Sequence, residues 1–454
     1  MKNILYIHTH DSGRIISPYG YQVSTPNLQK FAQTATVFRN AYCVGPTCSP
    51  SRAGLLTGTY PHQNGMLGLA QRGFELDYQK HLVRYLNKHG YMTVLCGIQH
   101  ESGWYLDRGE AAEKIGYQQE LTTDSRGIAE EELIHWDKAN ADEVSHWLKS
   151  DQSGQPFFLS YGMFATHRNF PVPEEGSVLA DYTRVPYPVP DTEETRKDFA
   201  GYLLSIQSAD DCFGQVIEAL KESGHWEDTI IIFTTDHGLA NPFAKCTLFD
   251  SGIGVALMMR VPQIKGRVLD SLVSQIDIFP TICDLLELPK PEYLEGVSLL
   301  PLLIKEQKEV RQEIMAEINF HTSYEPARCI RNQRYKYIRY FDPEYLRINQ
   351  SNIDESLTKD FFNEQGLQQY IKAEEALYDL TFDPSERNNL AVNAEYREIK
   401  EELKQKLLDW QIKTQDPILN GEIKIRPEWK VNTKQCQKAK SGRPEDYVQV
   451  SQSQ

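Results

Sequence analysis

Short apolar runs, separated by stretches with helical periodicity, constrain the fold of this chain more than any other feature of its sequence. Five such runs stand out, at residues 3–9, 37–42, 93–97, 156–161 and 229–235, and all but the second end in polar residues. Helical patterns lie between them, at 26–35, 140–149 and 199–223. Strands that alternate with helices predict an α/β fold built on a layered sheet. In such folds the polar clusters at the carboxyl ends of the strands are where active sites form.

The pattern changes near residue 310, which indicates a second, smaller unit. We expect residues 312–318 to form a last strand of the main sheet, 327–340 to form a hairpin rich in Arg and Tyr, and 396–415 to form an amphipathic helix. Residues 378–391 are loop-like, and the last forty or so residues are polar without clear periodicity. The sequence therefore predicts a main domain over residues 1–318 and a C-terminal α+β subdomain with an antiparallel sheet over residues 319–454.

Charge and cysteine usage exclude several classes of protein. The formal net charge is −15 over 454 residues, so neither nucleic acid nor an anionic membrane is an expected partner. The eight cysteines are scattered without CxxC pairs, which argues against a zinc ribbon or a disulfide framework. The apolar N-terminal stretch is too short for a signal peptide, and no apolar run approaches membrane-spanning length. We therefore expect a cytoplasmic protein.

The most informative stretch is Cys48-Ser49-Pro50-Ser51-Arg52-Ala53-Gly54-Leu55-Leu56-Thr57-Gly58. It resembles the signature of the sulfatases of the alkaline-phosphatase superfamily, C-x-P-S-R with Thr-Gly a few residues on. The resemblance implies an alkaline-phosphatase-like α/β/α sandwich with a large mixed sheet. It also implies that Cys48 is oxidised to formylglycine by a separate maturation enzyme, and that one hydroxyl of the hydrated aldehyde attacks sulfur while the other later expels sulfate.

The residues of this stretch suit such a role. Pro50 predicts a helix start and places Cys48 near the N-terminal end of that helix, where free backbone N–H groups favour an anion. Arg52, one turn further on, adds a cation that can neutralise bound sulfate. For a lone cysteine, a buried structural role before an ordinary helix would be the simpler explanation.

The resemblance also implies a divalent metal ion. The first strand ends in His8-Thr9-His10-Asp11 and a later one in Thr235-Asp236-His237-Gly238. Carried over by position, Asp11, Asp236, His237 and the modified Cys48 would bind the ion. His10 stands where the family usually has a second Asp, so it either ligates the metal or orients Asp11 from outside the ligand set. Calcium or magnesium is the family expectation, whereas imidazole ligands suit manganese or zinc.

Three further segments resemble sulfatase motifs that carry acid–base residues and residues in contact with the sulfate. His167, in Phe164-Ala165-Thr166-His167-Arg168, matches the histidine that protonates the leaving group, and a near-neutral pKa suits that work. His100, in Gly97-Ile98-Gln99-His100, matches the residue that contacts the gem-diol. The lysine usual at the second position of that motif is Ile98 here, so one cation is missing. Lys245 matches the residue that contacts the sulfate and the bridging atom.

Within the family, CSPSRAGLLTG followed by HQNGMLGL is most similar to heparan N-sulfatases, which suggests a sulfated amino sugar as substrate. We expect four side chains to line the sugar pocket: Arg168, His321, Glu325 and Arg328. The predicted hairpin also carries three cations that could bind a polyanion: Arg331, Arg334 and Lys336. An exposed charged face would explain the hairpin residues equally well.

Two other functions compete with a sulfatase. A phosphonate monoester or phosphodiester hydrolase shares the superfamily, and the Asp236-His237 pair and Ile98 favour it slightly. A non-catalytic protein that binds sulfated glycans would explain His10 and Ile98, but the intact Cys48 motif argues against it.

Overall fold

The computed structural model describes residues 2–103, 108–150 and 154–450. Within this part of the chain, nine strands form a mixed sheet in the order β4-β3-β5-β1-β6-β8-β2-β7, with β9 beside β2. The central strands β3, β5, β1 and β6 are parallel to one another. The strands are β1 (Asn3–Thr9), β2 (Thr36–Tyr42), β3 (Met92–Gly97), β4 (Gln119–Glu120), β5 (Phe157–Gly162), β6 (Thr229–Thr235), β7 (Gly254–Val255), β8 (Leu257–Arg260) and β9 (Val268–Ser274).

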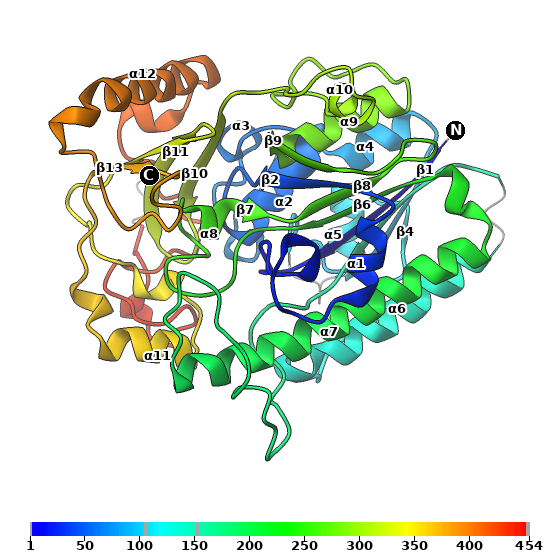
Figure 1. Cartoon of the computed structure of the whole chain (residues 1–454), viewed down its shortest axis with the longest axis horizontal. Coiled ribbons are helices and arrows are strands. Elements are labelled where there is room, and N and C mark those ends of the chain that lie inside the picture. Colours follow the sequence, from blue (N-terminus) through cyan, green and yellow to red (C-terminus); the bar gives the residue numbers. More distant parts are fainter. Residues whose placement is uncertain (1, 104–107, 151–153, 451–454) are drawn as a thin grey trace.

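Helices cover both faces of this sheet. Alternate residues of β1 pack into different cores: Leu5 and Ile7 belong to one, Ile4 and Tyr6 to the other. The first core is shared with α1 (Pro26–Ala32), α6 (Leu133–Lys149) and α7 (Glu193–Glu222). The second is shared with α2 (Cys48–Thr57), α4 (Leu82–Lys88), α5 (Arg108–Ile115), α9 (Ile278–Leu285) and α10 (Leu300–Leu303). The two groups lie on opposite sides of the strands in Figure 1, so the predicted α/β/α sandwich is confirmed.

The predicted helices exist, but their ends differ. Helix α6 begins at residue 133 rather than 140, and α7 begins at residue 193 rather than 199. Thr192 caps α7, because its hydroxyl accepts a bond from the backbone N–H of Thr195 ahead of the first apolar residue. The apolar pattern therefore located each helix but missed its first turns, although Leu133 and Trp136 at the start of α6 are buried. No helix of the described residues has both the length and the apolar character needed to cross a bilayer.

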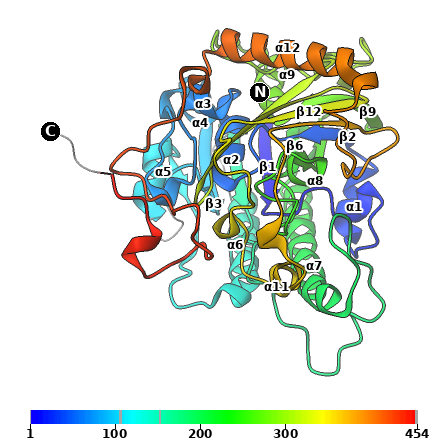
Figure 2. The ribbon, with the colours of Figure 1, turned by 90° about the vertical axis from the view of Figure 1, so that its left-hand side faces the viewer.

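The second sheet holds four antiparallel strands in the order β10-β11-β12-β13 within the described residues. These are β10 (Ile314–Phe320), β11 (Tyr324–Arg331), β12 (Tyr335–Tyr340) and β13 (Glu375–Asp379). Helix α12 (Arg397–Thr414) covers it, with Leu403, Leu407 and Trp410 packed on Ile330 and Tyr337. Figures 1 and 2 show this helix along the outer side of the sheet. The predicted hairpin, antiparallel sheet and amphipathic helix are thereby confirmed.

One predicted strand joins a different sheet. The segment expected to end the main sheet, 312–318, is β10, and it pairs with β11 in the second sheet. Strand periodicity predicts which residues are extended and which face is buried, but it does not name the pairing partner. The expected division after residue 318 falls inside β10, and residues 451–454 of the expected subdomain lie outside the described residues.

Candidate active site

Four parallel strands end at one edge of the main sheet, and their register brings distant residues together. His8 of β1 lies opposite Gly162 of β5, and Thr9 lies opposite Thr235 of β6. Gly97 of β3 is also paired with Gly162. The chain therefore leaves these strands side by side, which gathers the loops that carry Asp11, His100, His167 and Asp236.

The loops at this edge hold unusual backbone conformations. Asp11, His100 and Cys246 adopt positive φ angles of 50°, 66° and 62°. Such angles are uncommon outside glycine and cluster at functional sites, where the surrounding structure enforces them. Gly97 has φ of 81°, and a Cβ atom there would lie 2.0 Å from the carbonyl oxygen of Gly162. Only glycine permits β3 to end this close to β5.

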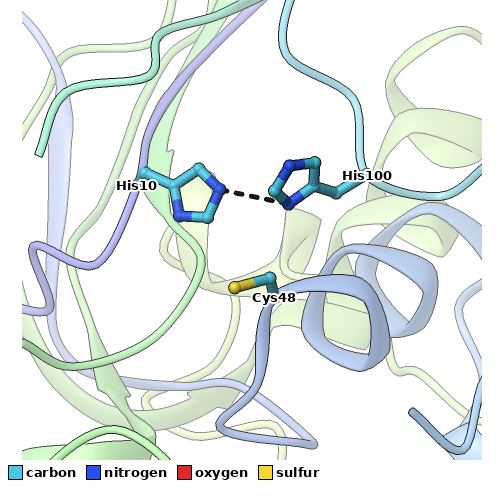
Figure 3. A group of neighbouring side chains, drawn as sticks. All are labelled: His10, Cys48 and His100. Atoms are coloured by element: carbon cyan, nitrogen blue, oxygen red, sulfur yellow. Dashed lines mark hydrogen bonds between the residues drawn. The ribbon is translucent and has the colours of Figure 1, made fainter. Parts of the chain in front are cut away.

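Cys48 is the first residue of α2, as Pro50 predicts, and its side chain is buried. Figure 3 shows its sulfur at the start of the helix, on the side of His10 and His100. The Sγ atom lies 3.4 Å from His237 Nε2. Burial raises the pKa of the Cys48 thiol well above its usual range, against the opposing charge of Lys245. The unmodified thiol is therefore a poor nucleophile at neutral pH.

Two carboxylates and two imidazoles converge beside this sulfur. His10 Nδ1 lies 3.1 Å from Asp11 Oδ1 and 3.2 Å from Asp236 Oδ2. His237 Nε2 lies 3.3 Å and 3.7 Å from the same two oxygens. All four side chains are buried, and His10, Asp11, Cys48 and Asp236 form a group whose donor atoms are close enough to share one ion. The chemistry of this donor set suits a divalent cation.

Buried cations balance the two carboxylates. Arg52 Nη2 lies 3.0 Å from Asp236 Oδ2, and Arg52 Nη1 contacts His8 Nδ1 at 2.5 Å. Lys245 Nζ lies 2.9 Å from Asp11 Oδ2. Burial alone would raise the pKa of Asp11, but Lys245, His167 and His237 together outweigh it and hold that pKa well below its usual range. Both carboxylates are therefore ionised, and their charge is available to a metal ion.

The two histidines expected to move protons line the same space. His100 Nδ1 lies 3.2 Å from His10 Nε2, the contact drawn in Figure 3. His167 Nδ1 contacts the carbonyl oxygen of Arg168, which fixes the orientation of the ring. The turn before His167 is held by Asp137 of α6, whose carboxylate accepts from the backbone N–H groups of Phe164 at 2.7 Å and Ala165 at 2.8 Å.

A cavity of about 570 Å³ opens onto these groups. Cys48, His100, His167, Lys245 and His321 all contribute to its lining. The main domain also contributes Leu69, Gln71, Arg72, Ser125, Arg126, Gly127, Ile128, Glu130 and Phe164 to the wall. The C-terminal unit contributes Thr322, Asp354, Lys430, Ala439, Lys440, Ser441 and Tyr447. A space of this size accommodates a small organic ligand such as a sugar.

Several residues expected at the sugar pocket lie elsewhere. Arg168 is held by Asp198 and Asn241 outside the cavity lining, and Glu325 bonds to Asn349, Asn352 and Lys372. Arg328 is fully buried between Asp416 and Glu317. The sequence showed that these residues carry charge, but each is engaged by other side chains, and none of the three belongs to the lining of the cavity that Cys48 and Lys245 share. We therefore withdraw Arg168, Glu325 and Arg328 as sugar contacts.

The expectation for the hairpin cations needs correction, whereas the absence of a cation at Ile98 agrees with the structure. Arg331 and Lys336 are buried and pair with Asp250, and only Arg334 is substantially exposed, beside Asp379. The hairpin therefore does not present a three-cation face to a polyanion. Ile98 packs in a buried cluster with Leu133, Trp136 and Phe164, so no cation stands at that position.

Sequence reasoning missed several polar residues of the site, among them His8, Asp137 and Asp354, and also the cavity cations Arg72, Arg126, Lys430 and Lys440. The sequence pattern identified His8 only as a residue of the first strand, although its side chain contacts Arg52. Asp137 lies within a helix, and Asp354 lies in a segment without a recognisable motif. Only the depletion of carboxylates from apolar helix faces could have singled out Asp137, and nothing local marks Asp354.

Comparisons with known proteins agree with this geometry. The family model described as Sulfatase matches residues 2–288, and that described as N-sulphoglucosamine sulphohydrolase, C-terminal, matches residues 236–373. Human N-sulphoglucosamine sulphohydrolase is 28% identical over 472 residues, covering 92% of this chain and 91% of the human protein.

Solved structures show the same fold. A protein in complex with its substrate D-glucosamine-2-N,6-O-disulfate has a TM-score of 0.68 at 20% identity, with 93% of this chain and 100% of that chain covered. The phosphonate monoester hydrolase of Agrobacterium radiobacter has a TM-score of 0.67 at 22% identity, with 94% and 100% covered. The strand register, the Cys48 motif and a family match over more than half of the chain lead to one conclusion: this protein belongs to the sulfatase family and is a hydrolase of that kind.

Proposed function

We propose that this protein hydrolyses a sulfate ester or sulfamate, with formylglycine derived from Cys48 as nucleophile. The observation that carries the proposal is the gathering of Cys48, the Asp11–Asp236 carboxylate pair and Lys245 at one end of a cavity. Formylglycine at position 48 would supply a hydrated aldehyde, which is both a nucleophile and a means of releasing sulfate.

The other residues of the site would each have a separate role in binding sulfate or transferring protons. Arg52 and Lys245, both buried and charged, would hold the sulfate oxygens, because charge-assisted bonds in a desolvated site are strong. His100 would take the proton from the attacking hydroxyl. His167 would donate a proton to the leaving group, and the hold of Asp137 on the preceding turn fixes where that proton is delivered.

We propose a divalent metal held by Asp11, Asp236, His237 and His10, together with residue 48. Bound there, the ion would neutralise charge on the sulfate group and on the nucleophile. His10 Nδ1 approaches both carboxylates as closely as His237 does, which favours a ligand over a purely orienting role. Two imidazoles make this a softer site than an all-oxygen one, so we expect manganese or zinc to bind better than calcium or magnesium.

A sulfated saccharide is the substrate class that we propose. The similarity to human N-sulphoglucosamine sulphohydrolase supports an amino sugar, and the cavity is large enough for one or two sugar rings. A separate maturation enzyme would have to convert Cys48. The C-terminal unit would act as part of the pocket, since it supplies His321 and Thr322 to the wall.

A phosphonate monoester hydrolase is the second candidate. The solved phosphonate monoester hydrolase shares the fold, and this chain has Ile98 where the usual sulfatase motif has a lysine that contacts the sulfate. The tetrahedral geometries of sulfate and phosphonate are close, so one site can turn over both.

The test is to co-express the protein with a formylglycine-generating enzyme and to compare an aryl sulfate, N-sulfoglucosamine and an aryl phosphonate, with C48A as control and a panel of metals. Mass spectrometry of the Cys48 peptide reports its conversion. We expect sulfate or sulfamate release that C48A abolishes. Turnover of the phosphonate alone would replace the proposed reaction with the alternative.

A further inference from the structure

A carboxylate that the proposed chemistry does not use lies inside the reaction cavity. Asp354 lines it together with Cys48, His100, His167 and Lys245. Its Oδ2 atom is 3.0 Å from Lys245 Nζ, and its side chain is 19% exposed. Burial by itself would raise its pKa, but Lys245 first and His167 next lower it to about 2, so Asp354 is ionised at neutral pH.

The loop that presents Asp354 is built to hold it in place. Asn352 Oδ1 accepts from the backbone N–H groups of Thr322 at 3.1 Å and Ser323 at 2.9 Å. Glu325 Oε2 accepts from the side-chain amides of Asn349 at 2.9 Å and Asn352 at 3.0 Å. A loop anchored through buried polar groups positions its neighbouring side chain as firmly as a strand does.

Asp354 contacts Lys245, which we assign to the sulfate oxygens, and the charge of His167, which we assign to the leaving group, acts on it. Lys245 is shared between Asp11 on the metal side and Asp354 on the cavity side. His167 is the group proposed to protonate the leaving atom, and its charge acts on Asp354. A fixed negative charge here has opposite effects on oxygen and nitrogen leaving groups.

An alkoxide that leaves a sulfate ester develops negative charge, which Asp354 would repel. The nitrogen of a sulfamate must be protonated before the S–N bond breaks, so it develops positive charge, which Asp354 would attract. The reaction R–NH–SO₃⁻ + H₂O → R–NH₃⁺ + SO₄²⁻ breaks one S–N bond and forms one S–O bond, without any change in oxidation state. His167 supplies the proton for the nitrogen, and the second proton on the product amine comes from water.

We infer that Asp354 is a specificity-determining residue that selects a sulfamate over a sulfate ester by stabilising the ammonium that forms on the leaving nitrogen. The inference deepens the proposed function and rests on it. Together with the cavity, it names the substrate class as an N-sulfated amino sugar whose freed amine contacts Asp354.

The test compares wild type and D354N on cyclohexyl sulfate and N-cyclohexylsulfamate, which differ only in the bridging atom, and on N-sulfoglucosamine. We expect kcat/KM for the two sulfamates to fall about 10- to 100-fold, the effect of losing one charge-assisted hydrogen bond, while cyclohexyl sulfate holds steady or improves. D354E keeps the charge and should retain part of the preference. The control is E355Q, which neutralises the adjacent carboxylate, 51% exposed beside Lys359.

An equal loss on sulfate and sulfamate would overturn the inference, because Asp354 would then only hold Lys245. A wild-type preference for the sulfate ester would overturn it as well. Calorimetric binding of glucosamine needs no turnover, and we expect D354N, but not E355Q, to weaken it about tenfold or more. If matured wild type hydrolyses no substrate, the proposed function fails, and glucosamine binding alone decides the inference.

Discussion

At the scale of single residues, the site depends on charges that are buried and paired. Asp11, Asp236, Arg52 and Lys245 are each 4% exposed or less. A buried charge is costly unless it has a partner, and here each carboxylate has a cation within 3.0 Å. The same pairing leaves both carboxylates ionised and pre-oriented, so a metal ion meets ligands that need little rearrangement.

The first prediction concerns His10. Changing His10 to Asp restores the acidic pair that this position usually carries in the family and replaces a borderline ligand with a hard one. We expect the preference for manganese or zinc over calcium to shift toward calcium by about 10- to 100-fold, measured by calorimetric titration of each metal. The exposed histidine of α6, in H146D, is the control. An unchanged preference would place His10 outside the ligand set.

The second prediction concerns Ile98. A lysine here would restore the missing cation of the family motif, but the side chain packs against Leu133, Trp136 and Phe164 and is fully buried. We expect I98K to lose about 2–4 kcal/mol of unfolding free energy in urea, because the ammonium has no partner in that cluster. The I98V control should lose only about 1 kcal/mol. If I98K proved as stable as I98V, the ammonium would have to reach the cavity.

At the scale of elements, the carboxyl ends of four parallel strands build the site, and helix α6 fixes the position of one of its turns. Asp137 of α6 reaches under the turn after β5 and accepts two backbone N–H bonds. The orientation of His167 therefore depends on a residue thirty positions earlier in the chain, on an element that contributes nothing else to the cavity lining.

The third prediction follows from this contact. Burial raises the pKa of Asp137 to about 7, against the pull of the Ala165 and Phe164 N–H groups. Because the folded pKa lies above the unfolded value of 3.8, the native state binds more protons between about pH 4 and pH 7. The contribution of Asp137 to the free energy of unfolding is therefore fully present below about pH 4, and it declines by about 4 kcal/mol as the pH rises through 7.

We expect D137N to lack this decline, so that its stability relative to wild type improves between pH 4.5 and pH 7.5 in urea unfolding. D142N, on the exposed face of the same helix, should follow wild type at both pH values. A difference between wild type and D137N that did not vary with pH would contradict the shifted pKa.

At the scale of the whole molecule, buried ionic networks join the second sheet to the main one. Lys336 of β12 is fully buried, and its Nζ lies 2.6 Å from Asp250 Oδ1 of α8 (Asp250–Ile253) and 2.8 Å from Glu386 Oε1. Arg328 of β11 forms a similar link to α3 (Pro61–Asn64). It contacts Glu317, and the Glu317 carboxylate accepts a hydrogen bond from the backbone N–H of His62. These contacts fix the wall that carries His321 and Asp354 against the edge that carries Cys48.

The fourth prediction tests whether the Lys336 ionic network holds the second sheet against the main domain. K336M leaves Asp250 and Glu386 with one cation fewer, so we expect a loss of about 3–5 kcal/mol of unfolding free energy and a reduced turnover. R334M, at the turn of the same hairpin, removes a half-exposed cation from beside the buried Asp379 and should cost less than K336M, about 1–2 kcal/mol. Equal costs for the two variants would show that the buried network does not hold the parts together.

The sequence by itself determined the layered α/β fold and placed the ends of the central strands β1, β3, β5 and β6 to within one residue. It could do so because strand periodicity and the run from Cys48 to Gly58 are local: the residues that carry the signal are adjacent in the chain. Asp11, His100, His167, Asp236 and Lys245 were predicted by position in such runs; His100, His167 and Lys245 line one cavity, while Asp11 contacts Lys245 and Asp236 contacts Arg52.

Only the tertiary structure decided which sheet β10 joins, which arginines are buried partners rather than sugar contacts, and that Asp354 faces the cavity. Each of these depends on contacts between residues far apart in the sequence, such as Arg328 with Asp416 and Asp354 with Lys245. An isolated arginine or aspartate has the same local signature whether it neutralises a buried charge or meets a ligand. What surrounds it after folding determines its role, because burial and pairing set both its charge and its freedom to bind.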